Sequence, residues 1–170
     1  MILSYILIAV FIVIDVILKQ IFAHSYQVGE VVPIIQNVLH VGYVQNTGAS
    51  FGMFEGHQLL FFFITILALI LFGYFFSKSD WKTKKLYTIA LIFLISGTLG
   101  NAIDRVLFGY VIDYVQMPFL PIVGGTIFNL ADVFLNFGVV MLFIDIIILD
   151  YFREKKLKDV SDETTQNHSN

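Results

Sequence analysis

The chain of 170 residues has no cysteine and few charged side chains. The lack of cysteine excludes disulfide frameworks, thiolate metal sites and cysteine nucleophiles. Only 14% of the residues are charged, whereas a soluble domain usually carries about 25%. Hydrophobic residues make up 58% of the chain, and the mean hydropathy is +0.83. This composition indicates a protein embedded in a membrane.

Residue patterns for several kinds of chemistry are also missing. No His-Glu-x-x-His sequence occurs, so a zinc metalloprotease is unsupported, and His24, His40 and His57 do not have metal-ligand spacing. We therefore expect no metal and no cofactor. A serine–lysine dyad would need Ser50 beside Lys19, but Ser50 lies in NTGASFG, which is typical of a turn.

Four segments are long and apolar enough to cross a bilayer, which takes about 20 helical residues. The N-terminal segment lacks a basic start and a small-residue cleavage site, so we interpret it as a retained span rather than a signal peptide. We predict an α-helical membrane protein with one four-helix domain over residues 1–157 and a polar, disordered cytoplasmic tail over residues 158–170. The four predicted transmembrane helices are Ile2–Phe22, Gln58–Ser77, Leu86–Arg105 and Phe128–Phe152.

The distribution of lysine and arginine predicts the orientation. Basic residues concentrate between the second and third spans and after the fourth span, so both termini are predicted to be cytoplasmic by the positive-inside rule. The two segments that then face outward, residues 24–57 and 106–127, contain no lysine or arginine. The first is β-branched and aromatic with glycine and proline between runs, which favours two or three short strands. Gly109–Val115 has the same character and could pair with them, so we expect a small extracytoplasmic β layer over the bundle.

Two carboxylates stand out near the outer boundary. Asp132 lies at the start of the fourth span, where an acid is costly and suggests a functional site with a partner. Asp113 lies in the outer segment that leads into this span. Two neighbouring carboxylates cannot both ionise easily, so one holds a proton while the other can take one from water. The hypothesis is hydrolysis by this pair, which would titrate as a unit.

Further polar residues are predicted to gather at the same level. Asp15 and Lys19 share one face of the first span at the i,i+4 spacing. The other members of this predicted shell lie at the outer ends of the third and fourth spans: Asn101, Asp104, Arg105, Asn129 and Asn136. Asp145 lies about 20 Å along the fourth helix from Asp132, so we interpret it as a separate structural acid near the inner leaflet.

Each polar feature also has a purely structural interpretation. Asp15 with Lys19 could be a buried ion pair, and Arg105 could be an anchor that snorkels to water. The asparagines could be interhelical hydrogen-bonding residues. Asp132 could be an acid favoured by the helix dipole, and Asp113 an exposed loop carboxylate.

Two other functions remain open at this stage. A small proton-coupled transporter or channel could use Asp15, Asp132 and Asp145 as a proton path. Against it, the acids form no ladder across the bilayer, and transporters tend to have internal repeats, which are not evident here. A non-enzymatic assembly factor would tolerate asparagine at both Asp113 and Asp132.

Five short motifs follow one another along the chain. They are DVILK (Asp15–Lys19), NTGASFG (Asn46–Gly52), GTLGNAIDR (Gly97–Arg105), GYVIDYV (Gly109–Val115) and FNLADV (Phe128–Val133). Taken together and in order, they resemble the bacterial lipoprotein signal peptidases, also called signal peptidase II. The family often has a hydroxyl residue at the position of Leu18, and Ser50 replaces the more usual alanine; neither change touches the aspartates.

The resemblance implies an aspartic endopeptidase that removes signal peptides from prolipoproteins, cutting before a cysteine that carries a diacylglyceryl group. It implies that Asp113 and Asp132 form the catalytic dyad, at the outer face of the bacterial cytoplasmic membrane. The expected partners are lipid-modified prolipoproteins and membrane phospholipid, with no nucleic acid, and we expect a monomer. The resemblance also implicates a supporting shell of Asp15, Lys19, Asn46, Gly48, Asn101, Asp104, Arg105 and Asn129.

Overall fold

The computed structural model describes residues 1–48, 58–121 and 124–149. The predicted disordered tail and Ser50 therefore lie outside the described residues. Within the described part, four helices are long and apolar enough to cross a membrane, which confirms the predicted fold class. They are α1 (Ile2–Ser25), α2 (Gln58–Phe76), α3 (Lys85–Phe108) and α4 (Leu130–Ile144), the last continued by a π-helical turn, η2 (Asp145–Leu149).

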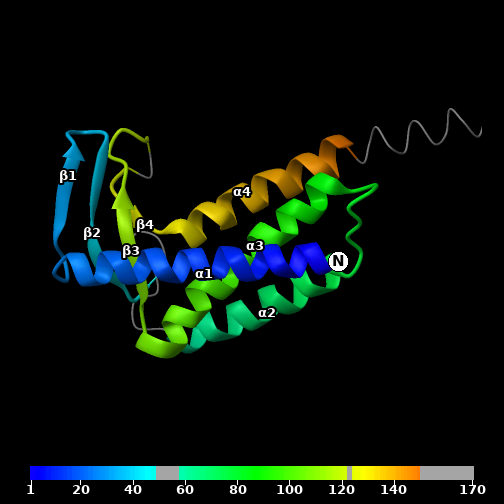
Figure 1. Cartoon of the computed structure of the whole chain (residues 1–170), viewed down its shortest axis with the longest axis horizontal. Helices are drawn as coiled ribbons and strands as arrows, with labels where there is room; N and C mark the ends of the chain where they lie inside the picture. Colours follow the sequence, from blue (N-terminus) through cyan, green and yellow to red (C-terminus); the bar gives the residue numbers. More distant parts are fainter. Residues whose placement is uncertain (49–57, 122–123, 150–170) are drawn as a thin grey trace, which may run out of the picture.

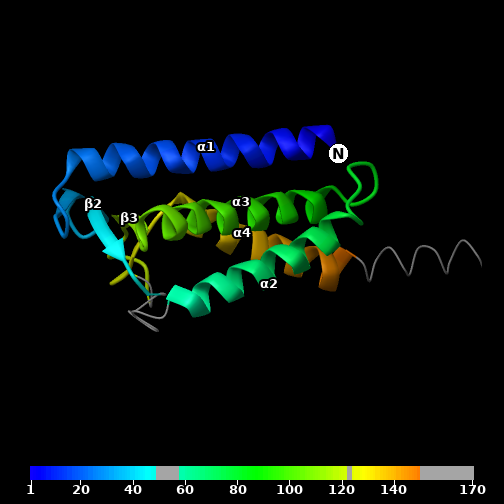
Figure 2. The ribbon, with the colours of Figure 1, turned by 90° about the horizontal axis from the view of Figure 1, so that it is seen from below.

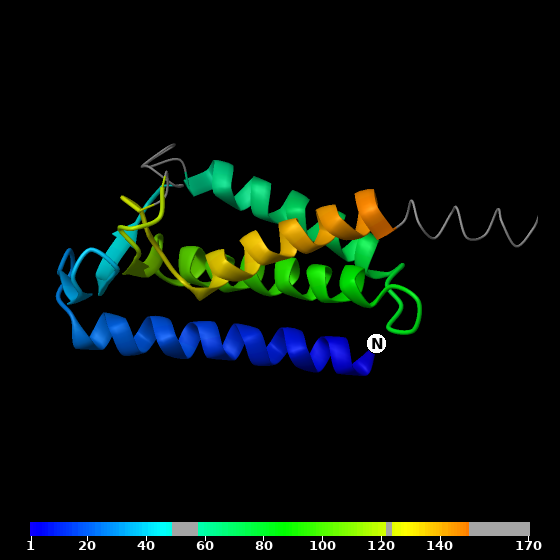
Figure 3. The same ribbon diagram turned by 90° about the horizontal axis from the view of Figure 1, so that it is seen from above.

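Helix α3 is the centre of the bundle, lying between α1 and α2 with α4 packed along it (Figures 2 and 3). Glycines make this packing close. A Cβ atom on Gly97 would lie 2.5 Å from the carbonyl oxygen of Ala131, and one on Gly138 would lie 2.7 Å from Cγ of Leu94. Small residues at such contacts let helix backbones approach within a membrane, where packing rather than hydrophobic burial drives association.

Helix α1 contacts the bundle through a narrow, partly polar face. Its buried residues are Ser4, Ile8, Asp15 and Lys19, while many of its apolar side chains are exposed. Ser4 accepts a hydrogen bond of 2.7 Å from the indole nitrogen of Trp81, which ties α1 to the connection between α2 and α3. The exposed apolar side chains fit a helix whose remaining surface faces lipid.

A small antiparallel sheet lies at the end of the bundle opposite the N-terminus (Figure 1). Its strand order follows the sequence, and β2 pairs with β3 so that Val44 lies opposite Asp113 and Asn46 opposite Val111. This confirms the expected β layer and the pairing of the Gly109–Val115 segment with the earlier strands. The strands are β1 (Val31–Ile35), β2 (Leu39–Asn46), β3 (Val111–Gln116) and β4 (Ile127–Phe128).

The fourth helix begins later than the sequence suggested. Phe128, predicted to be helical, instead belongs to β4 and pairs with Val115. Asn129 has extended backbone angles and is the N-cap of α4, where it forms a capping box with Asp132. Such reciprocal side-chain bonds satisfy amides that the first helical turn leaves free, so they fix the start of the helix at Leu130.

Candidate active site

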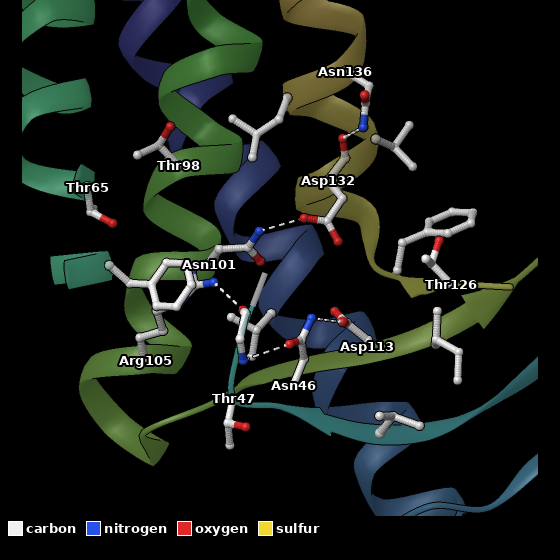
Figure 4. A pocket seen from close by; sticks show the side chains of 18 of the residues that line it. Asn46, Thr47, Thr65, Thr98, Asn101, Arg105, Asp113, Thr126, Asp132 and Asn136 are labelled. Atoms are coloured by element: carbon white, nitrogen blue, oxygen red, sulfur yellow. Dashed lines mark hydrogen bonds between the residues drawn. The ribbon is translucent and has the colours of Figure 1, made fainter. Parts of the chain in front are cut away.

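A cavity of about 1020 Å³ opens between α2, α3, α4 and the sheet, and both predicted aspartates line it (Figure 4). Asp113 comes from β3 and Asp132 from the first turn of α4. Apolar side chains of α2 and α4, including Phe61, Ile64 and Phe137, form much of the remaining wall. The cavity thus combines a pair of acids with an apolar surface long enough to run along two helices.

Asn129 connects the two aspartates. Its side-chain nitrogen donates to Oδ1 of Asp113 at 2.7 Å, and its backbone nitrogen donates to Oδ2 of Asp132 at 3.1 Å. Its side-chain oxygen accepts from the backbone nitrogen of Asp132 at 3.0 Å. One residue therefore fixes the strand that carries one acid against the helix that carries the other.

Two further asparagines hold the remaining carboxylate oxygens. Asn46 on β2 donates to Oδ2 of Asp113 at 2.8 Å, and Asn101 on α3 donates to Oδ1 of Asp132 at 2.8 Å. All four carboxylate oxygens thus accept hydrogen bonds from neutral groups. The ion pairs found among the described residues do not include either aspartate, so neither charge is cancelled by a contacting cation.

Burial and the charge of Asp132 raise the pKa of Asp113 from its ordinary value of 3.8 to about 7, against the opposing hydrogen bonds from Asn46 and Asn129. A carboxyl with this pKa exchanges its proton near neutral pH. Two nearby carboxylates that hold one proton between them are able to act as acid and base in the same reaction.

A buried ion cluster lies behind the pair, built on Lys19. The ammonium nitrogen lies 2.8 Å from Oδ2 of Asp15 and 2.9 Å from Oδ2 of Asp104. It also donates to Oδ1 of Asn101 at 2.9 Å. Asp15 and Lys19 therefore do form a buried ion pair. Lys19 also pairs with Asp104 on α3, a contact that the sequence did not predict.

The two carboxylates of this cluster also hold the backbone beside each aspartate. Asp15 accepts from the backbone nitrogen of Ala131 at 2.9 Å, one residue before Asp132. Asp104 accepts from the backbone nitrogen of Ile112 at 3.1 Å, one residue before Asp113. Asp15, Lys19 and Asp104 do not line the cavity, so they support the pair from behind it.

Arg105 faces the cavity, unlike Asp104 beside it. The guanidinium lies over the ring of Phe61, 4.8 Å from the ring centre, and donates to the carbonyl oxygen of Gly48 at 3.4 Å. The nitrogen of Gly48 in turn donates to the side-chain oxygen of Asn46 at 3.0 Å. These two neighbouring members of the predicted shell therefore have different surroundings, because Asp104 contacts Lys19 and Arg105 lines the cavity.

Asn136 occupies the helical turn after Asp132 and also lines the cavity. Its side chain is exposed and donates to the backbone carbonyl of Asp132 at 2.8 Å. Among the described residues, this side chain bonds the backbone of Asp132 and not the carboxylate group of either aspartate. Asn136 therefore lies at the wall of the cavity, next to the pair of aspartates.

Tyr114 is a residue of this site that the sequence did not single out. Its hydroxyl oxygen accepts from the backbone nitrogen of Leu130 at 3.2 Å, and its ring stacks on Phe22 with 4.4 Å between ring centres. Burial raises the pKa of Tyr114, so the hydroxyl stays neutral. Alternation along β3 predicts that Tyr114 points away from Asp113, but no sequence signal shows that it meets the start of α4.

The comparison with known proteins now decides the family. The family model described as "Signal peptidase (SPase) II" matches residues 7–148. The chain belongs to the signal peptidase II family. It is accordingly a membrane peptidase by descent, and the matched segment contains every residue of the site described above.

Relatives and solved structures agree with this assignment. The lipoprotein signal peptidase of Latilactobacillus sakei is 38% identical over 147 residues, covering 86% of this chain and 95% of the relative. The lipoprotein signal peptidase of Staphylococcus aureus is 38% identical over 156 residues, covering 91% and 93%. A bacterial membrane enzyme solved by the in meso method at 2.3 Å resolution superposes with a TM-score of 0.75 at 34% identity, covering 94% of this chain and 90% of that one. The fold and the family are therefore shared along nearly the whole chain.

Proposed function

We propose that this signal peptidase II family member is an aspartic endopeptidase that cleaves signal peptides from diacylglyceryl-modified prolipoproteins, with Asp113 and Asp132 as its dyad. The observation that supports this most is the link through Asn129, which holds both carboxylates on one large cavity. The relatives are named lipoprotein signal peptidases, which suggests the substrate class.

The reaction follows from one proton held between two carboxylates. The ionised carboxylate takes a proton from a water molecule as the water oxygen attacks the carbonyl carbon of the scissile amide. The protonated carboxyl donates a hydrogen bond, and then its proton, to the carbonyl oxygen. When the tetrahedral intermediate collapses, the C–N bond breaks and the leaving amine takes the proton that the first carboxylate removed from water. A hydroxyl of the intermediate returns its proton to the second carboxylate as the new carboxyl group forms, so the pair again holds one proton. Because asparagines already hold the carboxylate oxygens, little reorganisation is needed during the reaction.

The substrate's chemistry fits the two kinds of wall around the cavity. The apolar side chains of α2 and α4 would receive the signal helix and the acyl chains, while the scissile bond lies at the aspartates near the sheet. By the positive-inside rule, the lysine-bearing connection between α2 and α3 is cytoplasmic. The sheet and the dyad would then lie at the outer face, where the strand end at Asn46 and Gly48 would border the emerging mature portion.

Arg105 would position the substrate or the dyad, because it is the cation that lines this cavity among the described residues. Replacing it with alanine is expected to lower turnover without unfolding the protein. Arg105→Lys keeps the charge but loses the planar group over Phe61, so it tests geometry separately. Unchanged turnover in Arg105→Ala would return this residue to the role of an interfacial anchor.

Two competing functions are distinguishable. A proton-coupled transporter would need Asp15 to bind and release protons. Instead, Asp15 forms an ion pair with Lys19 and accepts a hydrogen bond from the backbone nitrogen of Ala131. A serine nucleophile has one literal match, because Gly48–Gly52 reads G-x-S-x-G. Ser50 lies outside the described residues, and the motif marks a nucleophile only on a sharp strand-to-helix turn. Ser50→Ala is expected to retain cleavage.

The substrate class is tested with purified protein in lipid vesicles and a prolipoprotein prepared with and without its diacylglyceryl group. We expect a shift in gel mobility only for the lipid-bearing form. Equal cleavage of both forms would show that the lipid is not recognised. If neither form is cut by folded protein, while a lipoprotein signal peptidase relative cuts the same preparation, the peptidase assignment to this substrate is wrong and proton transport should be measured.

A further inference from the structure

One end of the small sheet presents four exposed apolar side chains, called here the apolar rim. Antiparallel pairing of His40 with Gln116 places the β1–β2 turn and the β3–β4 connection at the same end of the sheet. The rim consists of Ile34, Ile35, Val38 and Phe119, which are 59%, 53%, 43% and 57% exposed. They come from the β1–β2 hairpin and from the β3–β4 connection, so the surface is assembled by the fold rather than by one apolar run.

The β1–β2 turn holds its part of the rim in a defined shape. The backbone nitrogen of Val38 donates to the carbonyl oxygen of Ile35 at 3.0 Å, and Asn37 takes the left-handed conformation with φ 60°. Asparagine tolerates this conformation better than most residues. The hairpin is therefore closed by a defined turn directly after the two exposed isoleucines.

The rim belongs to a sheet that lies across one end of the membrane-spanning bundle. The strands run across the helix axes at the end of the bundle opposite the N-terminus (Figure 1). The helices of the bundle are long and apolar enough to span a membrane and expose many apolar side chains. The lipid around the bundle therefore ends close to the sheet, and it is the nearest apolar environment for the rim.

We infer that the apolar rim inserts into the interfacial layer of the outer leaflet and sets the height of the sheet relative to the membrane. The segments that carry it, residues 24–57 and 106–127, contain no lysine or arginine, so contact rests on apolar burial and not on attraction to anionic headgroups. A fixed sheet height would keep Asp113 level with Asp132. This inference goes beyond the proposed function and does not depend on it.

The chain's lack of cysteine makes a depth measurement direct. Ile35→Cys and Phe119→Cys are labelled with a nitroxide in vesicles of phosphatidylglycerol and phosphatidylethanolamine. Gln27→Cys, an exposed position before the opposite end of β1, is the matched control, and Val140→Cys is the lipid-facing reference. Collision rates with oxygen, which partitions into lipid, and with a nickel chelate, which stays in water, are measured by electron paramagnetic resonance.

We expect an oxygen-to-nickel collision ratio several-fold higher at both rim positions than at Gln27, and below that at Val140. A rim ratio equal to that at Gln27 would overturn the inference, provided that the Val140 label reports lipid. Spin–spin broadening at the rim would instead show a second copy of the chain as the occupant, and a ratio that rises only when prolipoprotein is added would show the substrate. Either result would also overturn it.

Discussion

Replacing Asn129 separates the catalytic role of its amide from its role in starting α4. Asn129→Asp keeps a good N-cap, because aspartate accepts from the first-turn amides as well as asparagine does. It removes the amide hydrogen that reaches Asp113 at 2.7 Å and places a third carboxyl there. Asn129→Ala removes both the cap and the donor.

The magnitudes follow from the contacts. Loss of an N-cap costs about 1 kcal/mol, and loss of a hydrogen bond to a charged group costs about 1.5–3 kcal/mol. Asn129→Ala should therefore be less stable than wild type by roughly 2–4 kcal/mol. Both variants free Asp113 from α4, and a misplacement of about 1 Å at a reacting group can lower the rate about 100-fold. We expect a fall in kcat of that order for both variants.

Thermal unfolding in detergent and cleavage kinetics on a lipid-bearing prolipoprotein measure the two effects. Asn136→Ala is the matched control, since the Asn136 side chain is exposed and donates to a backbone carbonyl of its own helix; its stability should be close to that of wild type. If Asn129 sets the geometry of the two aspartates, Asn129→Asp should have a nearly normal melting temperature and a strongly reduced kcat. Wild-type kcat in folded Asn129→Asp would refute the idea that this residue sets the dyad geometry.

Three further predictions concern stability. Gly97→Ala should lower the melting temperature, because its Cβ would lie 2.5 Å from a backbone oxygen of α4, whereas Gly73→Ala, with nothing within 4 Å, should be neutral or raise it; equal effects would contradict the close packing. Asp113→Asn should be more stable than wild type above about pH 7, by up to roughly 4 kcal/mol, because a raised folded pKa favours the protonated acid. This difference in stability should disappear as the pH falls towards 4. A difference in melting temperature between Asp113→Asn and wild type that stays constant across this pH range would refute the raised pKa of Asp113. Lys19→Met leaves two buried carboxylates unpaired and should cost about 3–5 kcal/mol, while the exposed Lys78→Met should change the unfolding midpoint little; similar midpoints would show that the ion cluster is unimportant.

The membrane spans and the strand-forming segments could be predicted because their sequence signals are local. About 20 apolar residues need no partner to be recognised, and the run at Gly109–Val115 has β-branched and aromatic residues whatever it pairs with. The boundary at Phe128 was wrong because its apolar side chain suits both a strand and a helix. Its pairing with Val115 is a long-range contact that hydropathy does not record.

The composition of the site could be predicted, but its connections could not. Acids and amides in an apolar chain are conspicuous, so Asp15, Asn101 and Asp132 were identified from sequence. Which amide bonds which carboxylate depends on how three helices and a sheet meet. For the same reason the turn of Asp104 towards Lys19, and the hydroxyl of Tyr114 at the start of α4, became visible only in the structure.

The most direct test of the dyad is cleavage of a diacylglyceryl-modified prolipoprotein by three matched asparagine variants. Asp113→Asn and Asp132→Asn replace the proposed dyad, and Asp145→Asn replaces a buried acid that does not line the cavity. With all three folded, as judged by thermal unfolding, we expect no detectable cleavage by the first two and retained cleavage by the third. Cleavage at the wild-type rate by either Asp113→Asn or Asp132→Asn would contradict the assignment of these two residues as the catalytic pair.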